Sequence, residues 1–248
     1  MIKIQKPPEP QVLVDNKVTW TQNLLDAIAT YGEYSNIPEA EKSRLLSHYR
    51  HKDIQDALFE SSHHKCAFCE CIPGESSHIE VEHFEPKSLY PDLAFEWDNL
   101  LPSCRKCNEA KSDIDTRTNP IINPAIEDPE QLLTYSFLRI KPLAGSGQEL
   151  KAQRTINVCN LNCDRLYKAR SALMKSITEY IDELKDKINW ISEADTDQKR
   201  KIRITKLNNS IAVIDSLTTS ESAFSGYAKW FIQQFPEYQE AKRIVESR

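Results

Sequence analysis

The sequence predicts a mainly α-helical protein with a small, cysteine-rich module in its first half and long helices in its C-terminal half. Prolines provide the first observation: eight of the 13 lie between Pro73 and Pro142, and none lies between Leu143 and Phe235. Because proline breaks the interior of a helix, the proline-free stretch is typical of long helices. Cysteines provide the second, since five of the seven lie between residues 63 and 117.

The composition is that of a globular protein. The 248 residues are 40% hydrophobic and 28% charged, which suits one large domain or two small ones. No segment approaches the roughly 18 consecutive apolar residues of a membrane span, and the first ten residues lack the apolar core of a secretory signal. We therefore expect a cytoplasmic protein, whose thiols would bind metal or be buried rather than form disulfides.

Residues 1–62 are predicted to form an N-terminal helical region. Helix-start signals and apolar residues mark three segments in it. The first starts at Thr19 or Thr21, the second starts at Pro38, and the third contains Ile54, Leu58 and Phe59. These helices are expected to lead into the module at residues 63–117.

Residues 118–248 are predicted to form a C-terminal helical region. Apolar residues recur every three or four positions in two stretches, as the buried face of a helix requires. A break at residues 194–197 separates the stretches and predicts an antiparallel helix pair. Asn162 is expected to cap the first helix. A third helix is expected from Ser222 to Gln234, and Pro236 is expected to open a short fourth one.

Two C-x2-C motifs frame the module. Cys66 and Cys69 form the first and Cys104 and Cys107 the second, with 34 residues between them. Two such turns can direct four thiolates at one zinc ion and so stabilise a segment too small for a core of its own. Four ordinary buried thiols are the alternative. The remaining cysteines, Cys71, Cys159 and Cys163, are expected to be bystanders or buried side chains.

The insertion between the motifs must carry any chemistry, because four thiolates leave no open position on zinc. Residues 78–84 largely alternate polar and apolar side chains, which predicts a strand that ends at Glu82 and His83. Pro86 then stops the strand, and Asn99 and Leu100 precede the second motif. From about Arg105 the chain is expected to turn helical as far as Lys111.

These fixed points resemble the signature of the HNH endonucleases, a family with a ββα-metal fold. The shared features are the two C-x2-C pairs, an acidic residue and His at a strand end, Pro three residues later, Asn-Leu, and Cys-Asn with a following Lys. In this sequence they are Cys66, Cys69, Glu82, His83, Pro86, Asn99, Leu100, Cys104, Cys107, Asn108 and Lys111. The match covers under a quarter of the chain, but its many fixed points make it specific.

The resemblance implies a role for each residue. His83 would be the general base that takes a proton from water, and Asn99 would keep His83 aimed. Glu82 and Asn108 would bind one catalytic Mg2+ or Mn2+, the ions that carboxylate and amide oxygens favour, while Zn2+ would be structural. Phosphate contacts are expected from Lys87, Arg105, Lys106 and Lys111.

Simpler interpretations remain open at each position. Taken singly, Glu82 and Asn108 would be surface residues, Asn99 a turn residue, His83 a partly buried histidine and the lysines a solvated face. At the level of the whole protein, the alternative is a zinc-stabilised adaptor that binds nucleic acid or protein and cuts nothing. A zinc hydrolase is disfavoured because the sequence has no H-E-x-x-H motif.

A second resemblance spans most of the chain. The opening MIKIQKPPEPQVL, the stretch VEHFEPKS and the stretch VCNLNCDRLYKAR are similar to the HNH effectors of bacterial retron and Septu anti-phage systems. It implies cleavage of DNA, or of RNA such as tRNA, under control of an ABC/SMC-like ATPase, PtuA. A retron reverse transcriptase with its DNA–RNA hybrid would be an optional further partner. Docking would use the helical regions and Trp20, Trp190 and Trp230, although these side chains would fill a core equally well.

The charge bears on how such a protein would hold its substrate. The chain has 32 Lys and Arg against 37 Asp and Glu, a net charge of −5, although proteins that bind nucleic acid unaided are usually basic. Residues 63–117 hold six Lys and Arg against 11 Asp and Glu, so the whole deficit lies in the module. Tight binding is therefore expected from a partner or from a basic cluster of Lys199, Arg200, Lys201, Arg203 and Lys206.

Overall fold

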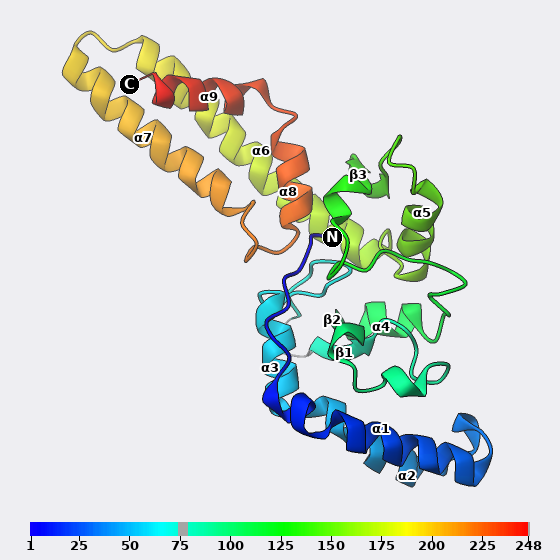
Figure 1. Cartoon of the computed structure of the whole chain (residues 1–248). Helices are drawn as coiled ribbons and strands as arrows, with labels where there is room; N and C mark the ends of the chain where they lie inside the picture. The colour runs from blue at the N-terminus through cyan, green and yellow to red at the C-terminus, as the bar shows by residue number, and fades with distance from the viewer. Residues whose placement is uncertain (74–78, 248) are drawn as a thin grey trace. The chain divides into compact units, whose positions relative to one another are not determined.

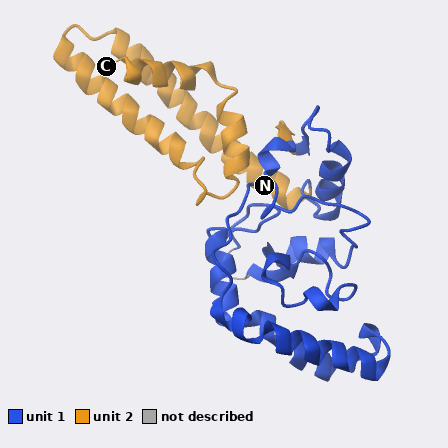
Figure 2. Ribbon diagram, in the orientation of Figure 1, with its two compact units in different colours: residues 1–133, 140–162 blue, residues 134–139, 163–248 orange. Residues whose placement is uncertain are grey.

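The computed structural model describes residues 1–73 and 79–247 and is mostly helical, as predicted (Figure 1). The chain divides into two compact units (Figure 2). Unit 1 comprises residues 1–133 and 140–162, and unit 2 comprises residues 134–139 and 163–248. This division differs from the predicted boundaries near residues 62 and 117, because the N-terminal helices and the cysteine module share one compact unit. Among the described helices, none combines the length and hydropathy needed to cross a membrane.

Unit 1 begins with three α-helices, as predicted, and with two 3-10 helices that were not predicted. They are α1 (Gln11–Tyr31), η1 (Tyr34–Asn36), α2 (Glu39–Leu46), η2 (Ser47–Arg50) and α3 (Lys52–Ser61). The first starts well before Thr19, because Pro10 sets the N-cap with a φ of −58° and Leu13 is already buried. Pro38 is likewise the N-cap of its helix rather than its first residue.

The cysteine module contains the predicted ββα arrangement. It consists of β1 (Ile79–His83), η3 (Pro91–Leu93), η4 (Trp97–Asn99), β2 (Leu100–Cys104) and α4 (Arg105–Lys111). The two strands are antiparallel, with Ile79 opposite Cys104 and His83 opposite Leu100. His78, the predicted start of the first strand, lies outside the described residues. The bounds of the second strand were not predicted from the residues, because all of them are buried and their polarity does not alternate.

The N-terminal helices complete the core of the module. Leu13, Leu24, Ile54 and Leu58 pack in one cluster with side chains from the module. Those module side chains are Val81, Ala94, Phe95, Trp97 and Leu100. Two five-residue strands cannot bury enough apolar surface alone, which explains why residues 1–62 are not a separate region.

Several elements between residues 129 and 158 were not predicted. They are a β hairpin, β3 (Leu133–Ser136) and β4 (Arg139–Pro142), and the helix α5 (Glu149–Val158), with η5 (Pro129–Gln131) before them. Asn162 was expected to cap the following helix, but its side chain instead bonds both the amide and the carbonyl of Ile140, at 2.9 Å each. Cys163 is the N-cap residue and makes no side-chain capping bond.

Unit 2 contains the four predicted helices, of which the first two are long. They are α6 (Asp164–Ser192), α7 (Asp197–Ser216), α8 (Ser225–Ile232) and α9 (Pro236–Glu246). Thr196 caps the second of these with its side chain, at the predicted break. The core takes side chains from all four helices: Ile177, Ile181, Leu184, Ile191, Ile204, Leu207, Ile211, Ile214, Ala228, Ile232, Tyr238 and Ala241.

The three tryptophans named as docking candidates make contacts within their own units. Trp20 stacks on His48, with ring centroids 4.6 Å apart. Trp190 lies under the cations of Arg203 and Lys206, at 4.4 Å and 5.1 Å from its ring centroid. Trp230 belongs to an aromatic cluster with Tyr135, Tyr227 and Phe231. Packing within the fold therefore accounts for these side chains.

Candidate active site and metal centre

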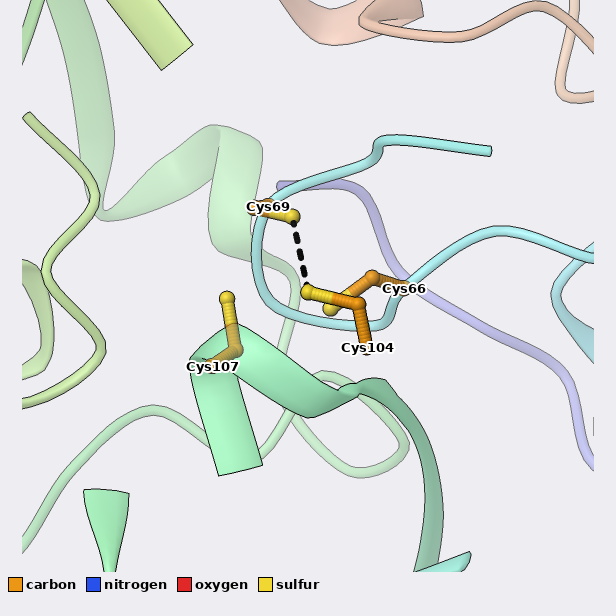
Figure 3. A group of neighbouring side chains, drawn as sticks. All are labelled: Cys66, Cys69, Cys104 and Cys107. Carbon is orange, nitrogen blue, oxygen red and sulfur yellow. Dashed lines mark hydrogen bonds between the residues drawn. The ribbon is translucent and has the colours of Figure 1, made fainter. Parts of the chain in front are cut away.

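The four cysteines of the C-x2-C motifs lie together (Figure 3). Cys66 and Cys69 come from the turn after α3, Cys104 ends β2, and Cys107 lies in the first turn of α4. Their sulfur atoms all lie within 4.8 Å of one another, and the Sγ atoms of Cys69 and Cys104 are 3.7 Å apart. A tetrahedral zinc ion with Zn–S bonds of about 2.3 Å places its sulfurs about 3.8 Å apart.

All four side chains are buried, and their chemistry suits the ion. Hydrogen bonds from Cys107, Cys66 and Cys69 hold the pKa of the Cys104 thiol well below its usual range, while burial and the same hydrogen bonds raise the pKa of the other three thiols, so the cluster shares one thiolate at Cys104. Spacing, burial and donor type thus all fit a structural zinc site, and the four-cysteine cluster could hold that ion.

The other cysteines differ in position. Cys71 lies at the edge of the cluster, with its Sγ 3.2 Å from that of Cys69. Cys159 is buried, which raises the pKa of its thiol, and its backbone carbonyl lies 3.7 Å from Cys107 Sγ. Cys163 is half-buried. None of the three belongs to the four-sulfur group.

His83 ends β1 and is buried, with 4% of its surface exposed. Its Nε2 lies 2.9 Å from the carbonyl oxygen of Ala94. A carbonyl can only accept a hydrogen bond, so Nε2 carries the proton and Nδ1 of the neutral ring keeps its lone pair. Burial, helped by the charge of Lys87, lowers the pKa of His83 to about 3. His83 is therefore neutral at physiological pH and has one nitrogen able to accept a proton.

Glu82 precedes this histidine and is held by a buried lysine. Lys111 on α4 lies 2.7 Å from the Glu82 carboxylate and donates to the His83 carbonyl oxygen at 2.9 Å. Burial raises the pKa of Glu82, and the charge of Lys111 opposes this rise. Lys111 thus ties the end of β1 to α4.

Asn108 lies on α4 one helical turn before Lys111, and it also faces β1. Its Nδ2 donates to the carboxylate of Glu80 at 2.7 Å. Glu80 and Glu82 are two residues apart on a strand, and Asn108 and Lys111 are three apart on a helix, so each pair lies on one face. Glu80 was not singled out from the sequence, although the two-residue period from Glu82 was the signal that could have identified it.

Asn99 fixes the loop that follows His83. Its Oδ1 accepts from the Glu85 amide at 2.7 Å, and its Nδ2 donates to the carbonyls of Glu85 and Leu93 at 3.0 Å each. Its own carbonyl accepts from the Phe84 amide at 2.8 Å. Three hydrogen bonds therefore hold Phe84 and Glu85, the two residues after His83, and a fourth holds Leu93, an arrangement suited to the expected positioning role.

The four expected phosphate contacts have different surroundings. Arg105 and Lys106 are exposed but both pair with Glu109, at 2.7 Å and 3.0 Å. Lys111 is buried and paired with Glu82, so the structure corrects its expected role: its charge is used inside the fold and does not face a substrate. Lys87 is half-buried, with its Nζ 5.6 Å from the centroid of the Tyr49 ring.

Two residues beside the site come from outside the module. Tyr49 meets the His83 ring edge to face, with centroids 4.7 Å apart. Arg50 lies over the Tyr49 ring at 5.3 Å and donates to its hydroxyl at 3.1 Å. No motif marks either residue, and 34 positions separate Tyr49 from His83, so only the folded chain reveals the contact.

Comparison with known proteins agrees with this geometry. Residues 66–113 match the model of the family described as HNH endonuclease. Septu protein PtuB of Bacillus thuringiensis is 33% identical over 187 residues, which cover 74% of this chain and 64% of that protein. The chain therefore spans somewhat less than two thirds of that relative.

Two other relatives are more distant or more local. Septu protein PtuB of Bacillus mycoides (strain KBAB4) is 24% identical over 264 residues, which cover 90% of this chain and 85% of that protein. Protein ea31 of Escherichia phage lambda is 33% identical over 94 residues, covering 35% of this chain and 31% of that protein.

Proposed function

Residues 66–113 belong to the HNH endonuclease family, and from this premise we propose that the protein is a metal-dependent endonuclease that hydrolyses phosphodiester bonds of nucleic acid. The observation that carries the proposal is the environment of His83. Its Nε2 is held by the Ala94 carbonyl, and its Nδ1 keeps a lone pair at the end of a strand that also bears Glu82. Two further observations support the proposal. The four-cysteine cluster could hold a structural zinc ion, and the Asn99 hydrogen bonds fix the loop after His83.

The residues divide the chemistry among them. Nδ1 of His83 accepts the proton of the attacking water, while the Ala94 carbonyl holds the ring in one tautomer. Asn99 keeps the loop after His83 in place. The Glu82 carboxylate and the Asn108 amide oxygen would hold Mg2+ or Mn2+, the ions such oxygen donors favour. The ion would supply charge relief at the phosphate and at the leaving oxygen.

Zinc would have a separate role. Four thiolates close its coordination shell, so zinc would hold the turn at Cys66 and Cys69 against the start of α4 and take no part in hydrolysis. This role suits the position of Asn108, which directly follows Cys107 and depends on that helix for its orientation.

The relatives called Septu protein PtuB suggest the biological setting. We infer that the protein is the toxic effector of an anti-phage defence system and cuts DNA, or an RNA such as tRNA. An ABC/SMC-like ATPase of the PtuA kind, in some systems with a retron reverse transcriptase and its DNA–RNA hybrid, would control it. The sequence itself has no G-x4-G-K-[ST] loop, so control by a nucleotide would come from another chain.

A cleavage assay with one substitution tests this proposal. Purified protein, alone and with its ATPase partner, is incubated with duplex DNA, single-stranded DNA and tRNA in Mg2+ or Mn2+. We expect cutting of at least one substrate by the wild type and loss of at least 100-fold in His83→Ala, the scale of general base catalysis. His51→Ala, an exposed histidine on the same unit, is the matched control.

Zinc content separates loss of chemistry from loss of fold. The His83→Ala protein should keep the zinc content and helical circular dichroism of the wild type. Equal cutting by His83→Ala would refute the assignment. A wild type that binds nucleic acid and cuts none of the substrates would favour a zinc-stabilised adaptor instead.

A further inference from the structure

Among the lysine and arginine side chains of the module, one is a candidate for binding a substrate phosphate. Arg105 and Lys106 pair with Glu109, Arg117 pairs with Glu85, and Lys111 pairs with Glu82. Lys65 is 2% exposed and cannot reach a ligand. Among the described residues, Lys87 is the module cation that no carboxylate engages, and its side chain is half-buried at the surface.

The N-terminal helical region adds a second cation beside the same tyrosine ring that Lys87 contacts. Arg50 is the last residue of η2, is exposed, and has no carboxylate partner within residues 1–73 and 79–247. Its guanidinium carbon and the Lys87 Nζ lie 5.3 Å and 5.6 Å from the centroid of the Tyr49 ring. The hydrogen bond from Arg50 to the Tyr49 hydroxyl and the two cation–π contacts orient both cations.

Tyr49 connects the two cations to the catalytic histidine. Its ring is 6% exposed, and its centroid lies 4.7 Å from that of the His83 ring at an interplanar angle of 89°. Two accessible cations are therefore fixed on an aromatic ring that itself touches His83. A guanidinium fork and an ammonium group together can grip two oxygens of a phosphate.

We propose that Arg50 and Lys87 form a phosphate clamp that holds the nucleic-acid backbone beside His83, with Tyr49 as the residue that positions both cations. The proposal rests on the proposed nuclease function and adds to it that the active site extends beyond residues 66–113. The clamp would also allow a module with a negative net charge to hold a phosphodiester. The ligand is the phosphate of a nucleic-acid backbone, whether DNA or RNA.

Binding without catalysis provides the first test. The full-length, zinc-loaded protein is titrated in magnesium-free buffer with fluorescent 12-nucleotide DNA and RNA of one sequence, at 20 to 150 mM salt. We expect Arg50→Gln and Lys87→Gln each to weaken binding about 10- to 100-fold, as for a lost hydrogen bond to a charged group. Each should also lower the slope of log affinity against log salt by about 1. Arg44→Gln is the control, since Arg44 is an exposed arginine of α2 that pairs with Glu41.

The role of Tyr49 is tested by a double-mutant cycle. Tyr49→Phe keeps the ring and removes the hydroxyl that Arg50 bonds. We expect it to weaken binding severalfold with an unchanged melting temperature, and to have no further effect in an Arg50→Gln background. A purely structural role would produce the same effect in both backgrounds.

The outcomes separate this proposal from the function on which it rests. Loss of binding in Arg50→Gln and Lys87→Gln supports the clamp even if no substrate is cut. If both variants match Arg44→Gln in affinity and salt slope, or if the wild type binds neither oligonucleotide at 20 mM salt, the clamp is refuted. In that case cleavage that depends on His83 would still support the nuclease.

Discussion

The cores of unit 1 and unit 2 differ in kind. Unit 1 buries two ion pairs, a histidine, two asparagines and the four thiols of the C-x2-C motifs, alongside its aliphatic side chains. Unit 2 buries mainly isoleucine and leucine from four helices, and within the described residues Arg170 and Ser225 are its buried polar side chains. Burying polar groups costs stability unless each is paired, so such a core indicates chemistry, whereas the core of unit 2 indicates packing.

Removing a zinc ligand should produce the largest difference in stability between the two units. Structural zinc sites contribute roughly 10 to 16 kcal/mol of binding free energy, which small modules need in order to fold. We expect Cys104→Ser to lose zinc and to expose unit 1 to limited proteolysis, while peptide bonds within α6 to α9 stay protected. Cys163→Ser, which changes a half-buried thiol outside the cluster, should keep its zinc. If Cys104→Ser made both units susceptible to proteolysis together, the proposed difference between the two units would be wrong.

A cavity in unit 2 should destabilise that unit and leave the zinc site of unit 1 unaffected. Leu207 is fully buried in α7, so Leu207→Ala should lower the free energy of unfolding of unit 2 by about 2 to 5 kcal/mol. Zinc affinity should not change. Ile202→Ala on the same helix is the control. Because Ile202 is 48% exposed, this substitution should change the free energy of unfolding by no more than about 0.5 kcal/mol. The measurement is urea unfolding followed by circular dichroism, and reduced zinc affinity in Leu207→Ala would be unexpected.

The smallest expected effect is a pH dependence in unit 1. Burial lowers the pKa of His83 to about 3, below the roughly 6.5 of an unfolded histidine. As pH falls from 7 to 5.5 the unfolded chain takes up a proton that the folded chain does not, so the free energy of unfolding falls. His83 should account for about 1 kcal/mol of that fall in magnesium-free buffer, and His83→Gln should remove it. An unchanged pH dependence in His83→Gln would show that His83 titrates normally.

The same contrast explains which elements the sequence predicted. Helices α6 and α7 and the break between them were predicted from an apolar period interrupted at residues 194–197, which is a local signal. The strand that ends at Glu82 and His83 and the helix from Arg105 were also predicted correctly. The bounds of strand β2 were not predicted, because the strand is buried throughout and its side chains show no alternation.

The parts of the site that were missed depend on contacts between distant residues. Tyr49 contacts His83, and Arg50 contacts Tyr49, only because the N-terminal helices fold onto the module, and no local pattern encodes that packing. Lys111 fits the family signature, yet its partner could not be read from spacing, so a buried ion pair with Glu82 was taken for a phosphate contact. Asn162 looked like a helix cap, but it bonds the backbone of Ile140 across 22 residues.

Metal content measured on one set of samples tests the central claim, that zinc supports the fold while a second ion at Glu82 and Asn108 supports the chemistry. Zinc would be counted by mass spectrometry, and bound Mn2+ by electron paramagnetic resonance, on wild type and Asn108→Ala. We predict one zinc and one Mn2+ per wild-type chain, and one zinc with no tightly bound Mn2+ and no cleavage in Asn108→Ala. Full Mn2+ binding and cleavage in Asn108→Ala would contradict the account.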